Sequence, residues 1–127
     1  MPATNLWPDF KIDPKPRGIR QVLEEAGSGL EDKTKGIVGF RVLPLDRSDN
    51  PALPFRFRCD LYVEKLDYNY PLLYVSSAAT GFPAEVSTYS GGIKVDDESA
   101  LLAALETIFH SGRTVAIVEN LISMATE

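Results

Sequence analysis

Cysteine and histidine each occur only once in the 127-residue sequence, and these counts limit the chemistry it can support. A lone Cys59 cannot form an intramolecular disulfide, which points to a fold without cross-links in a reducing compartment. One cysteine and one histidine also supply too few nitrogen and sulfur ligands for a zinc site. We therefore predict no bound metal and no other cofactor.

The sequence also lacks a long apolar run, a basic leader and an excess of cations. No apolar segment approaches the roughly 18 residues of a transmembrane helix, and no positively charged segment precedes an apolar one at the N-terminus. Thirteen Lys and Arg stand against eighteen Asp and Glu, which gives a net charge of −5. Because phosphate backbones repel such a chain, we predict neither a nucleic-acid nor a membrane partner. The same features predict a cytoplasmic protein of bacterial or phage origin.

Signatures of catalysis are missing as well. There is no G-x-S-x-G nucleophile motif, and no loop has the oxygen-ligand spacing of an EF-hand. We expect Cys59 to be a buried strand residue rather than a reactive thiol. His110 is expected in the last turn of a helix, where an imidazolium interacts favourably with the helix dipole. The sequence therefore favours a protein that is not an enzyme.

Residues 55–75 carry the strongest structural signal. Apolar and polar side chains alternate in the first half of this segment, with the two-residue period of a half-buried strand. The apolar set is Phe55, Phe57, Cys59, Leu61 and Val63, and the polar set is Arg56, Arg58, Asp60, Tyr62 and Glu64. After a turn at 67–69, Leu73 and Val75 alternate with Leu72 and Tyr74. The segment predicts two neighbouring strands.

The flanking segments complete an α+β pattern. The predicted strands are 37–45, 55–65, 71–76 and 82–88, with 93–95 as a candidate fifth strand at the sheet edge. Consecutive strands with short connections favour an antiparallel meander of three to five strands. Because helical patterns stand at both ends of this meander, we predict that helices cover one face of the sheet.

Three helices are predicted around the strands. Residues 17–33 repeat apolar side chains at helical spacing, and Gly27 and Gly29 predict a break or a close contact within that helix. Asp96–Glu98 form the start of a second helix, which Gly112 ends. Its predicted buried residues are Leu101, Leu102, Leu105, Ile108 and Phe109. Residues 113–125 are predicted as a third helix, although 114–118 also fit a strand.

Residues 1–16 form a proline-rich N-terminal arm ahead of a single domain at 17–127. The arm has four prolines and no periodicity, yet it contains Leu6, Trp7, Phe10 and Ile12. A free arm would leave a large apolar area in water, so we expect it to lie on its own domain or, failing that, on a partner chain. The arm and the exposed sheet edge both make a homodimer a compatible state.

Two function classes remain open on this sequence. The first is a noncatalytic protein-binding module, such as a small acidic immunity or antitoxin protein or a chaperone-like adaptor, whose net charge favours a basic partner. The second is a small enzyme or ligand-binding domain with a pocket of carboxylates and tyrosines between sheet and helices. Asp60, Glu64 and Glu85 are the carboxylates that such a pocket would bring together.

Arginine and tyrosine, the residues most enriched in binding hot spots, are concentrated near residues 55–75. The alternation places Tyr62 on the polar strand face, and Tyr68 and Tyr70 lie at the predicted turn. We expect these side chains to be accessible together with the two arginines. The predicted protein-binding residues are Arg56, Arg58, Tyr62, Tyr68 and Tyr70.

Overall fold

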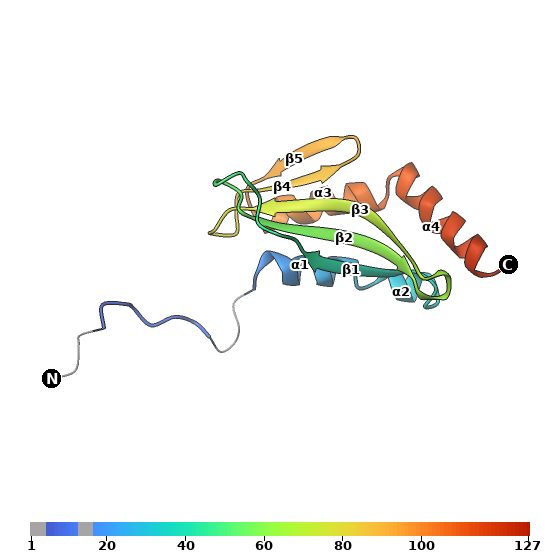
Figure 1. The fold of residues 1–127 in the computed structure, drawn as a ribbon, viewed down its shortest axis with the longest axis horizontal. Helices are drawn as coiled ribbons and strands as arrows, with labels where there is room; N and C mark the ends of the chain where they lie inside the picture. Colours follow the sequence, from blue (N-terminus) through green and yellow to red (C-terminus); the bar gives the residue numbers. More distant parts are fainter. Residues whose placement is uncertain (1–4, 13–16) are drawn as a thin grey trace.

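The computed structural model describes residues 5–12 and 17–127, and its fold is the predicted α+β arrangement (Figure 1). One N-terminal helical segment precedes an antiparallel sheet, and two helices follow it. In chain order the elements are α1 (Ile19–Gly27), α2 (Leu30–Lys33), β1 (Gly39–Pro44), β2 (Phe55–Val63), η1 (Glu64–Leu66), β3 (Tyr68–Ser77), β4 (Ala84–Thr88), β5 (Gly91–Val95), α3 (Glu98–Phe109) and α4 (Gly112–Ala125).

The five strands form one antiparallel sheet in the order β1-β2-β3-β4-β5, which confirms the predicted meander. The register between β2 and β3 changes within the sheet. Cys59 pairs with Leu73 but the next residue, Asp60, pairs with Pro71, so Leu72 is an extra residue in β3. A bulge of this kind inverts the alternation of side chains beyond it, because side chains in a strand repeat every two residues.

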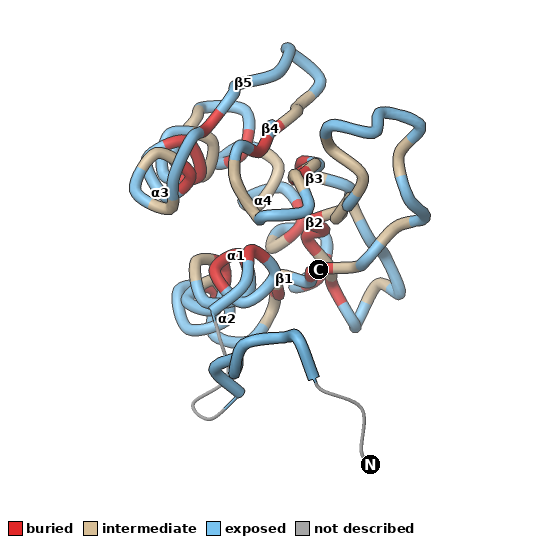
Figure 2. The backbone as a smooth tube through the Cα atoms, turned by 90° about the vertical axis from the view of Figure 1, so that its left-hand side faces the viewer, coloured by how far each residue is buried: buried red, intermediate tan, exposed pale blue. Residues whose placement is uncertain are grey.

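The helices pack on one face of the sheet, and the buried residues gather between the two layers (Figure 2). A larger cluster joins α1 and α3 to the strands, and a smaller one joins α4 to β2. Phe40 and Leu72 pack against both clusters. The opposite face of the sheet, which no described helix covers, is called the open face below.

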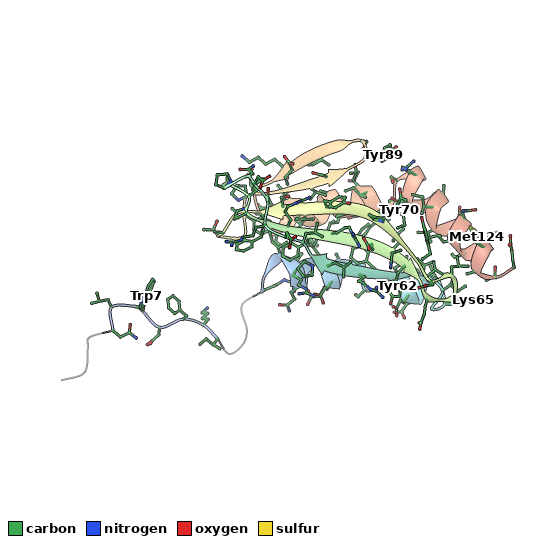
Figure 3. The ribbon with its side chains drawn as sticks, in the orientation of Figure 1. Trp7, Tyr62, Lys65, Tyr70, Tyr89 and Met124 are labelled. Atoms are coloured by element: carbon green, nitrogen blue, oxygen red, sulfur yellow. The ribbon has the colours of Figure 1, made fainter. Side chains whose placement is uncertain are left out.

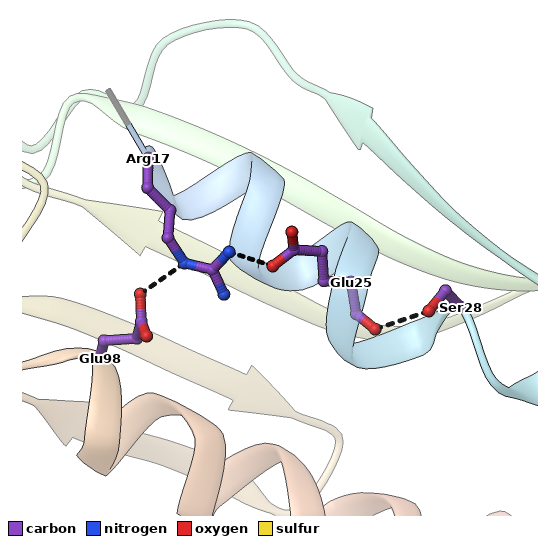
Figure 4. A network of polar contacts seen from close by, with 4 residues as sticks. All are labelled: Arg17, Glu25, Ser28 and Glu98. Atoms are coloured by element: carbon purple, nitrogen blue, oxygen red, sulfur yellow. Dashed lines mark hydrogen bonds and ion pairs between the residues drawn. The ribbon is translucent and has the colours of Figure 1, made fainter. Parts of the chain in front are cut away.

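A charged contact links α1 to α3 at the ends where both helices begin (Figure 4). Arg17 donates from Nε to Glu98 Oε1 at 2.9 Å, and its Nη1 pairs with Glu25. The hydrogen bonds to Glu98 and Glu25 raise the pKa of Arg17. These side chains are about half exposed, so we expect the contact to add little to the stability of the fold.

The first helical segment confirms the effect predicted for its glycines. It breaks into α1 and α2 at Ser28–Gly29, and the backbone of Gly27 lies against the ring of Phe40. A Cβ at position 27 would overlap the ring of Phe40, so only glycine fits there. Both expectations, a break and a close contact, are therefore met within one turn of chain.

Two details of the C-terminal helices differ from the prediction. Gly112 does not end α3, which stops at Phe109; it is instead the first residue of α4, and Ser111 caps that helix by accepting from Thr114 N at 3.2 Å. Leu102, predicted to be buried, is exposed, whereas Ala104, which was not predicted, lies in the core. The buried residues of α3 thus form a narrower stripe than the predicted set, which included two adjacent leucines. The helix predicted at 113–125 is confirmed.

The strands also differ in length from their predicted bounds. β3 begins at Tyr68, three residues earlier than predicted, and β2 ends at Val63 because a turn of 3-10 helix occupies Glu64–Leu66. Asp67 then adopts a left-handed conformation with φ 49° and closes the hairpin. Phe55 pairs with the buried Ser77 and so lies on the predicted side of the sheet, but it is 46% exposed because it is the first residue of β2.

The described part of the N-terminal arm, residues 5–12, extends away from the sheet and helices (Figure 1). Its four large apolar side chains are 64–89% exposed, and Trp7 contacts only the ring of Phe10 among aromatic neighbours, at 6.3 Å between centroids. The expectation that the arm lies on its own domain is therefore wrong in this structure. Residues 1–4 and 13–16 fall outside the described part of the chain.

Candidate protein-binding face

The pairing of the strands arranges the open face as rows of side chains that run across the sheet. Directly paired residues in an antiparallel sheet point to the same side, so each row can be read from the register. One row is Arg56, Ser76, Glu85 and Lys94; the next is Leu43, Arg58, Tyr74 and Ser87; the third is Arg41, Asp60 and Pro71; the last is Tyr62 and Asn69. Arginine and tyrosine side chains thus occupy adjacent rows.

A bidentate ion pair lies at the centre of the open face. Arg58 donates from Nε and Nη2 to the two carboxylate oxygens of Asp60, at 2.8 and 2.9 Å. Asp60 is fully buried, whereas about a third of the Arg58 side chain is exposed. The hydrogen bonds to Asp60 raise the pKa of Arg58 and fix the plane of its guanidinium. The sheet therefore presents this guanidinium to solvent in one orientation.

A second arginine is held by an aromatic ring. The guanidinium of Arg41 stacks over the ring of Tyr62 at 4.3 Å, and the Tyr62 hydroxyl donates to Glu31 of α2 at 2.8 Å. The ring lies over Gly39, where any Cβ would overlap it. The hydrogen bond to the Glu31 carboxylate raises the pKa of the Tyr62 phenol. Glycine, tyrosine and glutamate together position Arg41.

The charges of the chain are divided between the two sides of the sheet. The open face has four cationic side chains, Arg41, Arg56, Arg58 and Lys94, against two carboxylates, Asp60 and Glu85. The four helices instead contain seven carboxylates and three cations. Asp60 is buried and neutralised by Arg58, which leaves the exposed part of the face cationic. A protein with a net charge of −5 thus has a positively charged face.

The five predicted binding residues do not form one patch. Arg56, Arg58 and Tyr62 lie on the open face. Tyr68 pairs with Val63 and Tyr70 with Leu61, both of which face the helices. The bulge at Leu72 is the reason, because strict alternation from Tyr74 would have placed all three tyrosines of β3 on the open face. Figure 3 shows Tyr62 toward α2 and Tyr70 toward the start of α4.

Three residues of the open face were missed in the sequence analysis. Val38, Phe40 and Val42 recur at every second position of the sequence, so this alternation was sufficient to place Arg41 on the face opposite the buried Val42. Tyr74 was placed opposite Leu73 and Val75 but was not selected as a binding residue. The sequence could not place Lys94 on a face of the sheet, because the segment 93–95 is too short to show an alternation. Only the pairing of Lys94 with Glu85 places its side chain on the open face.

A separate pocket lies on the helix side, where β3, the β4-β5 hairpin and the α3-α4 junction meet. Its volume is about 530 Å³, and Arg113 stands at its rim. Arg113 donates from Nη2 to the Tyr70 hydroxyl at 3.2 Å and stacks over the ring of Tyr89 at 3.9 Å. Hydroxyls of Thr88, Ser90, Thr107 and Ser111 line the same pocket. Within the described residues Arg113 has no carboxylate partner.

The carboxylates expected in a pocket are apart from one another. Asp60 and Glu85 lie in different rows of the open face, and Glu64 lies in η1 beyond the end of β2. Residues 5–12 and 17–127 contain no group of three or more His, Cys, Asp or Glu that could hold a metal ion. Cys59 is buried as predicted, and burial raises the pKa of its thiol to about 12. His110 is the residue that follows the last turn of α3.

Comparison with protein-family models, with curated proteins and with solved structures finds no match to this chain. No single helix in the described residues is both long and apolar enough to cross a membrane; α3 and α4 meet that test only as a pair, bent by 57° at the break between them.

Proposed function

We propose that this chain is a noncatalytic protein-binding module, of the immunity, antitoxin or chaperone-like adaptor kind, and that it binds its partner through the open face. One observation carries the proposal: the face presents arginine and tyrosine side chains that intramolecular contacts already hold in place. Arg58 is fixed by Asp60, and Arg41 by Tyr62. Side chains ordered before binding lose less conformational entropy when a partner docks.

The charge on this face selects the chemistry of the partner segment. A cationic, aromatic surface favours a segment with carboxylates and exposed aromatic or aliphatic side chains, because guanidinium groups bind carboxylates in a bidentate manner. The basic partner expected from the net charge would instead meet the acidic helices on the other side. We propose the acidic segment as the ligand of the open face, since its arginines and tyrosines are the stronger hot-spot residues.

Selection from a library of random displayed peptides tests this proposal and requires no purified partner. Immobilised wild-type protein is compared with the open-face variant Arg41→Ser/Arg56→Ser and with the control Arg20→Ser/Lys33→Ser, which removes equal charge from the helices. We expect selected peptides to be rich in Asp and Glu and to bind the open-face variant about tenfold more weakly, a change of about 1.4 kcal/mol.

The control variant should bind the same peptides as tightly as the wild type does. Peptides that bind all three proteins equally, or a selection that enriches no acidic sequence, would contradict the proposal. Tyr68→Ala/Tyr70→Ala provides a second comparison, because these tyrosines lie on the helix side of β3. If that pair changes peptide affinity as much as the arginine pair does, the binding surface includes the hairpin end.

The pocket beside Arg113 favours a second candidate function, the binding of a small organic anion. An arginine without a carboxylate partner among the described residues stands over a space of about 530 Å³ with an apolar floor of Leu72, Val86, Ile93 and Ile108. This lining suits an amphipathic carboxylate, and the volume lies within the usual range of ligand sites, roughly 300–1,000 Å³. Octanoate should shift the amide signals of residues 88–93 and 107–114, whereas Arg113→Gln should abolish the shifts. Equal shifts with octanol would show that the arginine plays no part.

A further inference from the structure

An apolar groove separates α1 and α2 from the α3-α4 junction on the helix side of the molecule. Its volume is about 510 Å³, and it exposes part of the core between the two buried clusters. The floor consists of Phe40, Leu61, Leu72 and Phe109, and the walls of Ala26, Leu30, Val115 and Val118. The rings of Phe40 and Phe109 meet edge to face at 5.6 Å. Among the described residues, no side chain fills this groove.

The described arm presents a matching set of apolar side chains that have nothing to pack against. Leu6, Trp7, Phe10 and Ile12 are exposed, and Figure 3 shows Trp7 far from the sheet and helices. Exposed aromatic and aliphatic side chains in one short segment are typical of a binding segment rather than of a simple tail. The chain thus has an unfilled apolar groove and an unpacked apolar segment.

Charged residues of the arm and of the groove complement one another. The groove has Lys33 on its α2 side and Glu119 on its α4 side, and the arm has Asp9 and Lys11 between its apolar residues. None of these four side chains is in an ion pair within residues 5–12 and 17–127. An arm in the groove would pair Asp9 with Lys33 and Lys11 with Glu119, which sets its direction across the groove.

We propose that the arm of one copy of this chain docks in the apolar groove of a second copy, so that two copies exchange arms in a symmetric dimer. Arm residues point away from their own domain in the structure, and two of the four residues that join them to Arg17 are prolines. An arm that leaves in this direction presents its apolar side chains to a second copy rather than to the groove of its own chain.

The area that such an exchange buries matches the area of stable interfaces. A buried aromatic side chain removes about 150–250 Å² from water, so Trp7 and Phe10 of two arms account for roughly 600–1,000 Å². The exposed surface of the two grooves adds a smaller area, which brings the total to roughly 1,200 Å², the lower end of the range found in specific complexes. Two reciprocal contacts also make the interface isologous, as in most homodimers.

Trp7 is the only tryptophan, so its fluorescence reports on the arm alone. We expect the emission of the full-length chain to shift to shorter wavelength as concentration rises, over the range in which light scattering shows the molar mass to double. Val115→Glu puts a charge at the groove wall and should move both transitions to at least tenfold higher concentration. Met124→Glu, an equally exposed position on α4 outside the groove, should leave them unchanged.

A mixing experiment distinguishes exchange from docking within one chain. Val115→Glu keeps a functional arm, and Trp7→Ser/Phe10→Ser keeps a functional groove. Mixing these two variants should restore the blue shift of Trp7, because the arm of the first can enter the groove of the second. A blue shift that is independent of concentration would instead show docking on the same chain. A chain that stays monomeric without any shift of the Trp7 emission, or a dimer that forms without one, would also overturn the proposal. None of these outcomes tests the proposed binding of a partner by the open face.

Discussion

Single residues on the helix side are under tight steric constraint, and Gly27 shows this most directly. Phe40 cannot move aside to admit a methyl group at Gly27, because its ring also packs against Phe109 and against both core clusters. We expect Gly27→Ala to lower the free energy of unfolding by about 1–3 kcal/mol, the usual effect of overpacking a core. Urea denaturation followed by circular dichroism measures the change.

Gly29 provides the matched control for Gly27, two residues along the same segment. A Cβ there would have no neighbour within 4 Å, and the backbone φ of −76° suits any residue. Gly29→Ala should therefore be neutral or stabilising by up to about 1 kcal/mol. Equal losses at both positions would mean that chain flexibility, rather than the contact with Phe40, requires the glycines.

Cys59 makes the stability of the fold depend on pH in the alkaline range. Burial raises the pKa of its thiol from 9.0 to about 12, so between these values the unfolded chain releases a proton that the folded chain retains. Stability from this group is complete below pH 9 and is lost as pH rises toward 12. The expected loss is about 1.4 kcal/mol per pH unit above the ordinary pKa.

Comparing the wild type with Cys59→Ala isolates this titration from that of other groups. The substitution lowers stability at every pH because it removes buried volume, but it should flatten the alkaline decline relative to the wild type. Urea midpoints from neutral pH to about pH 11 give both curves. Parallel curves would show that Cys59 ionises as readily in the folded chain as in the unfolded one.

At the scale of elements, the start of α3 rests on a single capping side chain. Asp97 accepts a hydrogen bond from the backbone N–H of Ala100 at 2.7 Å, while the neighbouring Asp96 makes only a 3.9 Å contact with Lys94 and is largely exposed. We expect Asp97→Ala to destabilise the fold by about 1 kcal/mol and Asp96→Ala to change stability by less than about 0.5 kcal/mol. Thermal denaturation of both variants measures the difference, and equal effects would mean that total charge rather than the cap stabilises this helix end.

Element order, sheet type and most core positions were predictable from the sequence, because they depend on periodicity and end signals. Alternation in β2 identified Cys59, Leu61 and Val63, and the glycines located the break between α1 and α2. The candidate binding face was predictable only in part. Alternation holds within a regular ladder, and the one signal of a break in β3 is Pro71, because proline inside a central strand is found at bulges. That single irregularity separated Tyr68 and Tyr70 from Tyr62.

At the scale of the whole molecule, the described residues of the arm make no polar contact with the folded part of the chain. No hydrogen bond or ion pair joins residues 5–12 to residues 17–127. Removing residues 1–16 should therefore change the free energy of unfolding by less than about 0.5 kcal/mol at protein concentrations low enough to prevent association. At high concentration the full-length chain should become the more stable of the two, because arm exchange stabilises only the folded state.

Urea denaturation of both chains at low and high concentration measures these differences. A truncated chain that is less stable even at low concentration would indicate that the arm packs on its own domain. A difference that does not grow with concentration would contradict the exchange of arms. The same comparison tests whether residues 17–127 fold as one domain, since a loss of cooperativity on truncation would extend the domain into the arm.

The extra residue at Leu72 has a consequence for insertions and deletions in this chain. In a surface loop, gaining or losing one residue changes length and little else. Deletion of Leu72 would join Pro71 to Leu73, which already pair with the neighbouring residues Asp60 and Cys59. The ladder would become regular, and Tyr68 and Tyr70 would stay on the helix side. Loss of one residue at this point thus leaves both surfaces of the hairpin end in place, whereas loss of one residue from a regular part of β3 would exchange them.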